Sequence, residues 1–122
     1  MTQIGWVPKS FSLSIKQGSA GTSRVVMVVT NSDGSPLSSY AGWTAQAKFT
    51  LAYPVSTPIT KTPTVTGNAG AMTFTVDIAF VEADTATASP GLWAGDLCMI
   101  DPSGNLYFPA NFALTIQPSY AT

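Results

Sequence analysis

Apolar and polar side chains alternate along most of the chain. Phe11, Leu13 and Ile15 alternate with serines and a lysine, and a similar alternation runs from Met72 to Phe80. Because successive side chains of a β-strand point to opposite faces, this period of two predicts strands with one buried face. The pattern recurs in residues 43–50, 93–99 and 112–116, and residues 24–30 are predicted to form a further strand from their β-branched composition.

Residues that favour turns separate these segments. Asn31–Pro36 and Asp101–Asn105 each combine residues that accept a positive φ with a proline that fixes φ, which predicts a turn at both places. Prolines between Tyr53 and Thr66 lack the amide hydrogen that a sheet interior needs, which predicts an edge strand or an irregular crossing. Residues 81–89 could make one helical turn but are too short for a stable independent helix, so we predict a connection there. About seven short antiparallel strands without a long helix predict an all-β, immunoglobulin-like two-sheet β-sandwich.

Two kinds of pattern also predict which residues are buried. Residues 24–30 are rich in β-branched side chains and apolar on both faces, which predicts a central strand covered on both sides. Trp43 and Trp93 each lie on the apolar face of a predicted strand. We therefore expect both indoles in the core.

Trp6, Tyr107 and Phe108 lie instead near turns, in segments without a clear alternation. Exposed aromatic side chains in such positions often become contact anchors. We predict that these three residues contact a partner. An alternative use of the aromatic residues is a platform on which sugars stack, as in glycan-binding β-sandwich modules.

The composition is low in charge. Charged residues make up 9% of the 122 positions, against about 25% in an average soluble protein. The length fits one domain spanning residues 1–122, and the net charge of −1 gives little repulsion between copies. We therefore expect neighbours to cover much of the surface in the working state; an ordinary neutral, threonine-rich β domain is the alternative.

Nucleic acid and membrane are not expected as partners. The five basic residues are spread along the chain, whereas duplex binding depends on neutralising several phosphates together. The longest aliphatic run, Val25–Val29, is far shorter than the ~20 residues of a membrane helix. The first eight residues also lack the basic start and apolar stretch of a secretory signal.

Catalytic and metal chemistry have little support in the sequence. There is no histidine, and Cys98 is the only cysteine, which excludes an internal disulfide and leaves the thiol without a base to activate it. Asp77 and Asp96 would form a paired-carboxylate site if they met across a sheet, but solvated outward positions are favoured. Asp33–Gly34 and Asp101–Asn105 offer too few oxygen ligands for calcium and match simple turns. No catalytic residue, metal site or cofactor is predicted.

The order of several segments resembles a known family. Asn31–Leu37 after a hydrophobic strand, then Trp43–Phe49, Pro90–Leu97 and Asp101–Gly104, resemble the N-terminal domain of the baseplate upper protein family of tailed bacteriophages. Pro90–Leu97 is similar to that family's Pro-Gly-x-aromatic-x-x-acid-aliphatic strand, and the next turn to its Asp-x-x-Gly turn. Such domains usually open a longer chain that holds the receptor-binding protein, whereas this sequence ends at Thr122.

The resemblance implies a non-enzymatic structural protein of a bacteriophage virion, synthesised in the host cytoplasm. Either a tail or baseplate component or a module that decorates the capsid fits it, so head or tail location stays open. We expect protein–protein contacts in repeated copies, as a homo-oligomer or other symmetric assembly. A glycan-binding module is the alternative, and fold alone does not decide between the two.

Overall fold

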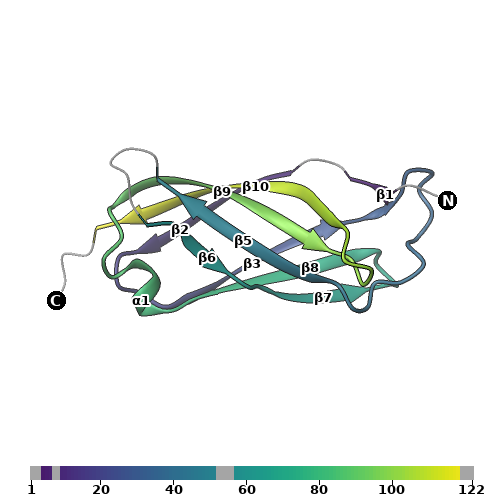
Figure 1. Cartoon of the computed structure of the whole chain (residues 1–122), viewed down its shortest axis with the longest axis horizontal. Helices are drawn as coiled ribbons and strands as arrows, with labels where there is room; N and C mark the ends of the chain where they lie inside the picture. Colours follow the sequence, from purple (N-terminus) through teal and green to yellow (C-terminus); the bar gives the residue numbers. More distant parts are fainter. Residues whose placement is uncertain (1–3, 7–8, 52–56, 119–122) are drawn as a thin grey trace.

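The computed structural model describes residues 4–6, 9–51 and 57–118, and these residues form mainly β-strands. Figure 1 shows an elongated molecule in which two sheets are stacked in layers. One sheet has five strands in spatial order: β2 (Lys9–Lys16), β10 (Leu106–Gln117), β9 (Gly91–Ile100), β5 (Thr44–Thr50) and β6 (Ile59–Lys61). The other has three: β3 (Gly21–Val28), β8 (Thr73–Phe80) and β7 (Thr64–Asn68). β1 (Ile4–Gly5) pairs with β4 (Thr30–Asn31) beside them, and the all-β prediction is confirmed.

One strand pair departs from the prediction of antiparallel strands throughout. β2 runs parallel to β10, with Phe11 beside Phe112 and Leu13 beside Leu114. The prediction is wrong here because β2 does not form a hairpin with β3. Its turn at Gln17 carries the chain into the other sheet, which leaves β2 at the sheet edge next to a strand of the same direction.

The core lies between the two sheets. Trp93 is fully buried and Trp43 is 8% exposed, as predicted, and their indole nitrogens donate to the carbonyl oxygens of Ser89 and Ser39 at 3.0 and 3.2 Å. Buried indoles need such partners, so the tryptophans fix their own connecting segments. The largest buried side chains from the two sheets that pack against them include Phe49, Phe74, Val76, Ile78, Leu97 and Leu114.

The segment predicted as a central strand lies at an edge instead. β3 pairs only with β8 in the described residues, and Val26 and Val28 on its outer side are 52% and 61% exposed. The prediction is wrong because β-branched residues favour the strand backbone whether or not they are buried. A strand that is apolar on both faces can therefore leave one of those faces exposed to solvent, as β3 does.

The connections agree with the turn chemistry. Residues 52–56 lie outside the described residues, and beyond them β6 and β7 are edge strands of different sheets, so the predicted edge and crossing are confirmed. A single helical turn, α1 (Glu82–Thr85), joins β8 to β9. The buried Thr85 hydroxyl accepts from the Gly18 amide at 2.9 Å, which ties this end of the molecule together. No helix in the described ranges is long and apolar enough to cross a membrane.

Candidate functional site

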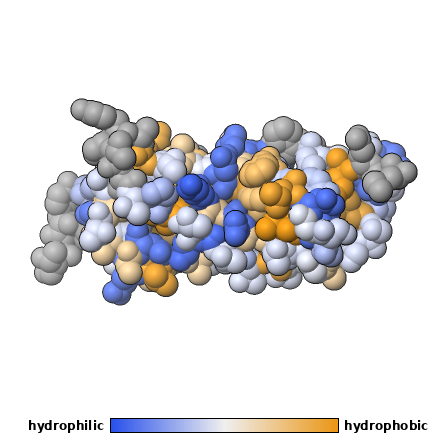
Figure 2. Space-filling view, viewed as in Figure 1, coloured by the Kyte–Doolittle hydropathy of each residue, from blue (hydrophilic) through white to orange (hydrophobic). Residues whose placement is uncertain are grey.

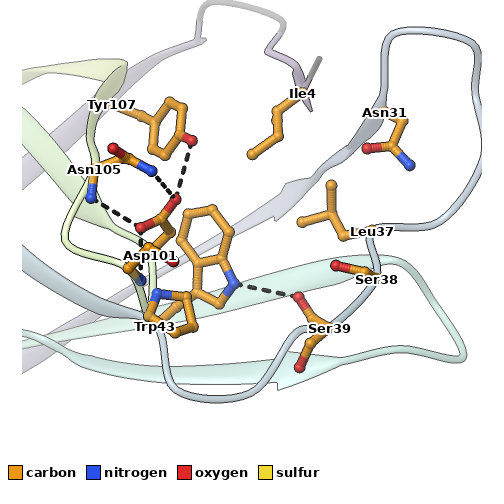
Figure 3. Close-up of a pocket in the computed structure, with 11 residues that line it drawn as sticks. Ile4, Asn31, Leu37, Ser38, Ser39, Trp43, Asp101, Asn105 and Tyr107 are labelled. Atoms are coloured by element: carbon orange, nitrogen blue, oxygen red, sulfur yellow. Dashed lines mark hydrogen bonds between the residues drawn. The ribbon is translucent and has the colours of Figure 1, made fainter. Parts of the chain in front are cut away.

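The end of the molecule opposite α1 carries a cavity between two connecting segments. β5, β9 and β10 are neighbours, so the segment before β5 and the turn between β9 and β10 emerge together at this end, next to β1 (Figure 1). Between them lies a cavity of about 790 Å³, which we call the tip pocket (Figure 3). Its lining combines apolar and polar side chains, among them Ile4, Asn31, Leu37, Ser38, Trp43, Asp101, Asn105 and Tyr107.

Two aromatic side chains, Trp43 and Tyr107, line the tip pocket, and Trp6 packs against both of them without lining it. The ring centroids of Trp6 and Tyr107 are 5.2 Å apart, and Trp43 lies 6.1 Å from Trp6 and 5.7 Å from Tyr107. Trp6 and Tyr107 are half-buried by this packing, although we expected exposed anchors. The buried Nε1 of Trp6 has no acceptor among the described residues.

The Asp101 carboxylate at the rim of the pocket is hydrogen-bonded within the turn between β9 and β10 and to Tyr107. The carboxylate of Asp101 accepts from the amides of Ser103 and Asn105 at 2.9 and 2.8 Å, from the Asn105 side chain at 2.9 Å and from the Tyr107 hydroxyl at 3.1 Å. These bonds, with the Asn105 side chain foremost, lower the pKa of Asp101. Burial raises the pKa of Tyr107, and its bond to Asp101 adds to the effect. The carboxylate therefore holds the turn and is not free to act as a base.

Phe108 faces away from this cluster, because consecutive residues of β10 point to opposite faces. It is 70% exposed on the outer side of the five-stranded sheet, and Leu106 on the same side is 58% exposed. The predicted contact residues are thus divided between two surfaces. Sequence reasoning missed Leu106, because the alternation of Phe112, Leu114 and Ile116, extended back along β10, places Leu106 on the inner face. The register shift between Tyr107 and Ala110 reverses the two faces.

The candidate chemical groups are not brought together. Asp77 and Asp96 lie on the outer sides of different sheets, so the suggested meeting of the two carboxylates is excluded. Asp77 instead accepts two hydrogen bonds from Arg24, at 2.7 and 3.1 Å, which lower its pKa. Cys98 lies half-buried on β9. No cluster of three or more metal-ligating side chains occurs in residues 4–6, 9–51 and 57–118.

Comparison with known proteins adds no assignment: no protein-family model matches the chain, and no curated protein matches it in sequence. The resemblance to baseplate upper proteins stays a prediction from the segments around Asn31, Trp43 and Pro90. Two features of the described surface could bind a partner: the exposed apolar side chains of Leu106 and Phe108 on the outer side of the five-stranded sheet, and the tip pocket with its aromatic lining residues.

Proposed function

We propose that this protein is a non-enzymatic structural protein of a bacteriophage virion that acts through protein–protein contacts in repeated copies, in the tail or baseplate or as a capsid decoration. The observation that carries the proposal is the joint exposure of Leu106 and Phe108, at 58% and 70%, on one face of a chain with only five basic and six acidic residues. Large apolar side chains exposed together are typical of contact surfaces. The segment resemblance supplies the virion context.

The strand order supports an immunoglobulin-like sandwich as the module. In that fold the third, sixth and seventh strands form one sheet, while the second, fifth and fourth form the other. Here β5, β9 and β10 are neighbours in one sheet and β3, β8 and β7 in the other, in the same chain order. β6 would then be an added edge strand, and β2 the first strand moved to the side of the last.

Purified particles test the virion role. We expect quantitative mass spectrometry of particles banded on a density gradient to find the chain at a constant ratio to the major capsid protein, with a copy number that matches a symmetric assembly. Cryo-electron microscopy of the same particles would show where it lies. Finding the chain only outside particles would overturn the proposal.

A glycan-binding role is the second candidate, because the lining of the tip pocket combines the aromatic side chains of Trp43 and Tyr107 with amide and hydroxyl groups. Titration calorimetry with neutral oligosaccharides tests it. If this role is correct, Asn105→Ala at the tip pocket weakens sugar binding at least tenfold. Phe108→Ala, on the outer side of the five-stranded sheet, leaves sugar binding unchanged. An absence of binding by the parent protein at millimolar sugar contradicts it.

A further inference from the structure

The outer face of the five-stranded sheet carries a projection at one end. Leu106 lies opposite Ile100 in the register of β10 and β9, and Phe108 follows on the same side two residues along. We call Leu106 and Phe108 the knob. Figure 2 shows hydrophobic surface in the right-hand half of the molecule, over β9 and β10. Both side chains are more than half exposed, so the knob stands out into solvent.

A depression of about 510 Å³ lies next to the knob on the same strands. Small side chains create it, because Ala94 and the backbone of Gly95 leave space between the longer side chains of β5, β9 and β10. We call this depression the hollow; around it lie Lys48, Thr50, Asp96 and Asn111. A projection and a depression on one face are the requirement for a surface that fits a second copy of itself.

The charges at the hollow favour a second copy over a charged partner. Lys48 and Asp96 lie directly opposite each other on β5 and β9 and are both exposed. They cancel in sign, so the hollow itself is neutral, and it selects neither an acidic nor a basic partner. Because an interface of strongly like charge would oppose self-association, the neutrality of the hollow is a condition for the contact of two copies there.

We propose that two copies pack through this face about a two-fold axis, with the knob of each copy seated in the hollow of the other. The inference deepens the proposed virion role and rests on it, since it names the contact through which repeated copies meet. Four strands about 4.8 Å apart and about eight residues long give a flat area of roughly 500 Å² per copy. That area belongs to small interfaces, so the dimer is weak on its own and is reinforced where many copies are held together.

Sedimentation velocity of the full chain from micromolar to millimolar concentration tests the proposal. We expect a reversible monomer–dimer equilibrium that Phe108→Ser, which removes the larger side chain of the knob, weakens at least tenfold. Ala94→Gln, which fills the hollow, is expected to weaken it by a similar factor. Val28→Ser is the matched control, because Val28 is 61% exposed on the other sheet, and it should change the dissociation constant less than twofold.

Mixing the two variants decides whether the contact is reciprocal. A mixed dimer of Phe108→Ser with Ala94→Gln retains one knob and the open hollow that receives it, so the mixture should associate more tightly than either variant alone. Circular dichroism establishes that each variant is folded. A parent chain that stays monomeric at millimolar concentration, or a mixture no tighter than its components, overturns the dimer. Particle analysis is independent: a chain found in virions but monomeric in solution refutes this interface and leaves the virion role standing.

Discussion

The outer face of each sheet carries a pair of opposite charges on neighbouring strands, and the two pairs differ in whether they form an ion pair. On the three-stranded sheet Arg24 lies directly opposite Asp77, and the two side chains form a two-pronged ion pair at 2.7 and 3.1 Å. On the five-stranded sheet Lys48 lies directly opposite Asp96 in the same register relationship, yet they form no ion pair in the described structure and line the hollow instead. The charged residues of the three-stranded face are therefore paired with each other, whereas Lys48 and Asp96 of the five-stranded face lie unpaired within the described ranges, at the hollow.

Exposed apolar residues alone do not distinguish the faces. Val26 and Val28 are exposed on the three-stranded sheet much as Leu106 and Phe108 are on the five-stranded sheet. Valine side chains are short and project little, whereas leucine and phenylalanine bring more apolar area to a contact. The five-stranded face, which we propose as the interface, therefore differs from the other face by its projection and depression, and not by the exposure of apolar side chains as such.

Truncating Trp93 tests most directly which side of the five-stranded sheet is the inner one. Trp93 is fully buried and its neighbour Leu92 is 65% exposed on the opposite face of the same strand. Trp93→Ala should lower the free energy of unfolding by ~3–5 kcal/mol, whereas Leu92→Ala should change it by less than about 0.5 kcal/mol. Urea denaturation measures both. Equal losses would show that the two faces have been assigned wrongly.

A pair of glycines, one from each sheet, gives a smaller effect. A Cβ on Gly95 of β9 would lie 2.6 Å from the Phe49 ring, whereas a Cβ on Gly21 of β3 would meet nothing within 4 Å. Gly95→Ala should therefore cost about 1–3 kcal/mol through overpacking beneath the hollow. Gly21→Ala should be neutral or slightly stabilising, because it restricts the unfolded chain. Thermal unfolding of the two variants would contradict this if Gly95→Ala matched the parent.

Much of the fold was predictable because the period of two is local. The strands around Leu13, Phe74 and Trp93 and the turns between them follow from neighbouring residues alone. The parallel edge of β2 and the exposure of Val26 were not predictable, since both depend on which layer the chain enters after a turn.

The surfaces were less predictable than the strands, for the same reason. Phe108 was found as an exposed aromatic, but Leu106 was hidden by the register shift in β10. The hollow beside them depends on small residues of β9 lying next to β5 and β10. The tip pocket depends on two turns, far apart in sequence, that emerge at the same end of the molecule. Such convergence is a property of topology that no single segment encodes.

Reversing one charge on each outer face tests which face takes part in the proposed dimer. Lys48→Glu gives the five-stranded face two acidic side chains, so we expect the dimer to weaken several-fold at low salt and to recover partly as salt screens the repulsion. Arg24→Glu makes the same change on the other face and should leave the dissociation constant unchanged. Sedimentation at two ionic strengths measures both, and an equal response would remove the distinction between the faces.

The smallest effect is expected for the ion pair that closes the three-stranded face. Arg24 lowers the pKa of Asp77 below its ordinary value of 3.8, chiefly through its hydrogen bonds to the carboxylate. A carboxyl group with a lowered folded pKa stabilises the fold above its unfolded pKa, and this contribution is lost as the pH falls through the folded value. Because the Arg24 side chain is exposed and that of Asp77 is partly exposed, the effect on stability is slight and diminishes with salt. In Arg24→Gln the Asp77 pKa should return towards its ordinary value, observed by NMR titration of the carboxyl carbon, while Lys48→Gln should leave it unchanged. If Asp77 titrates in the same way in the parent and in Arg24→Gln, the Arg24–Asp77 ion pair does not persist in solution. The charges of the three-stranded face would then be as unpaired as Lys48 and Asp96 on the five-stranded face.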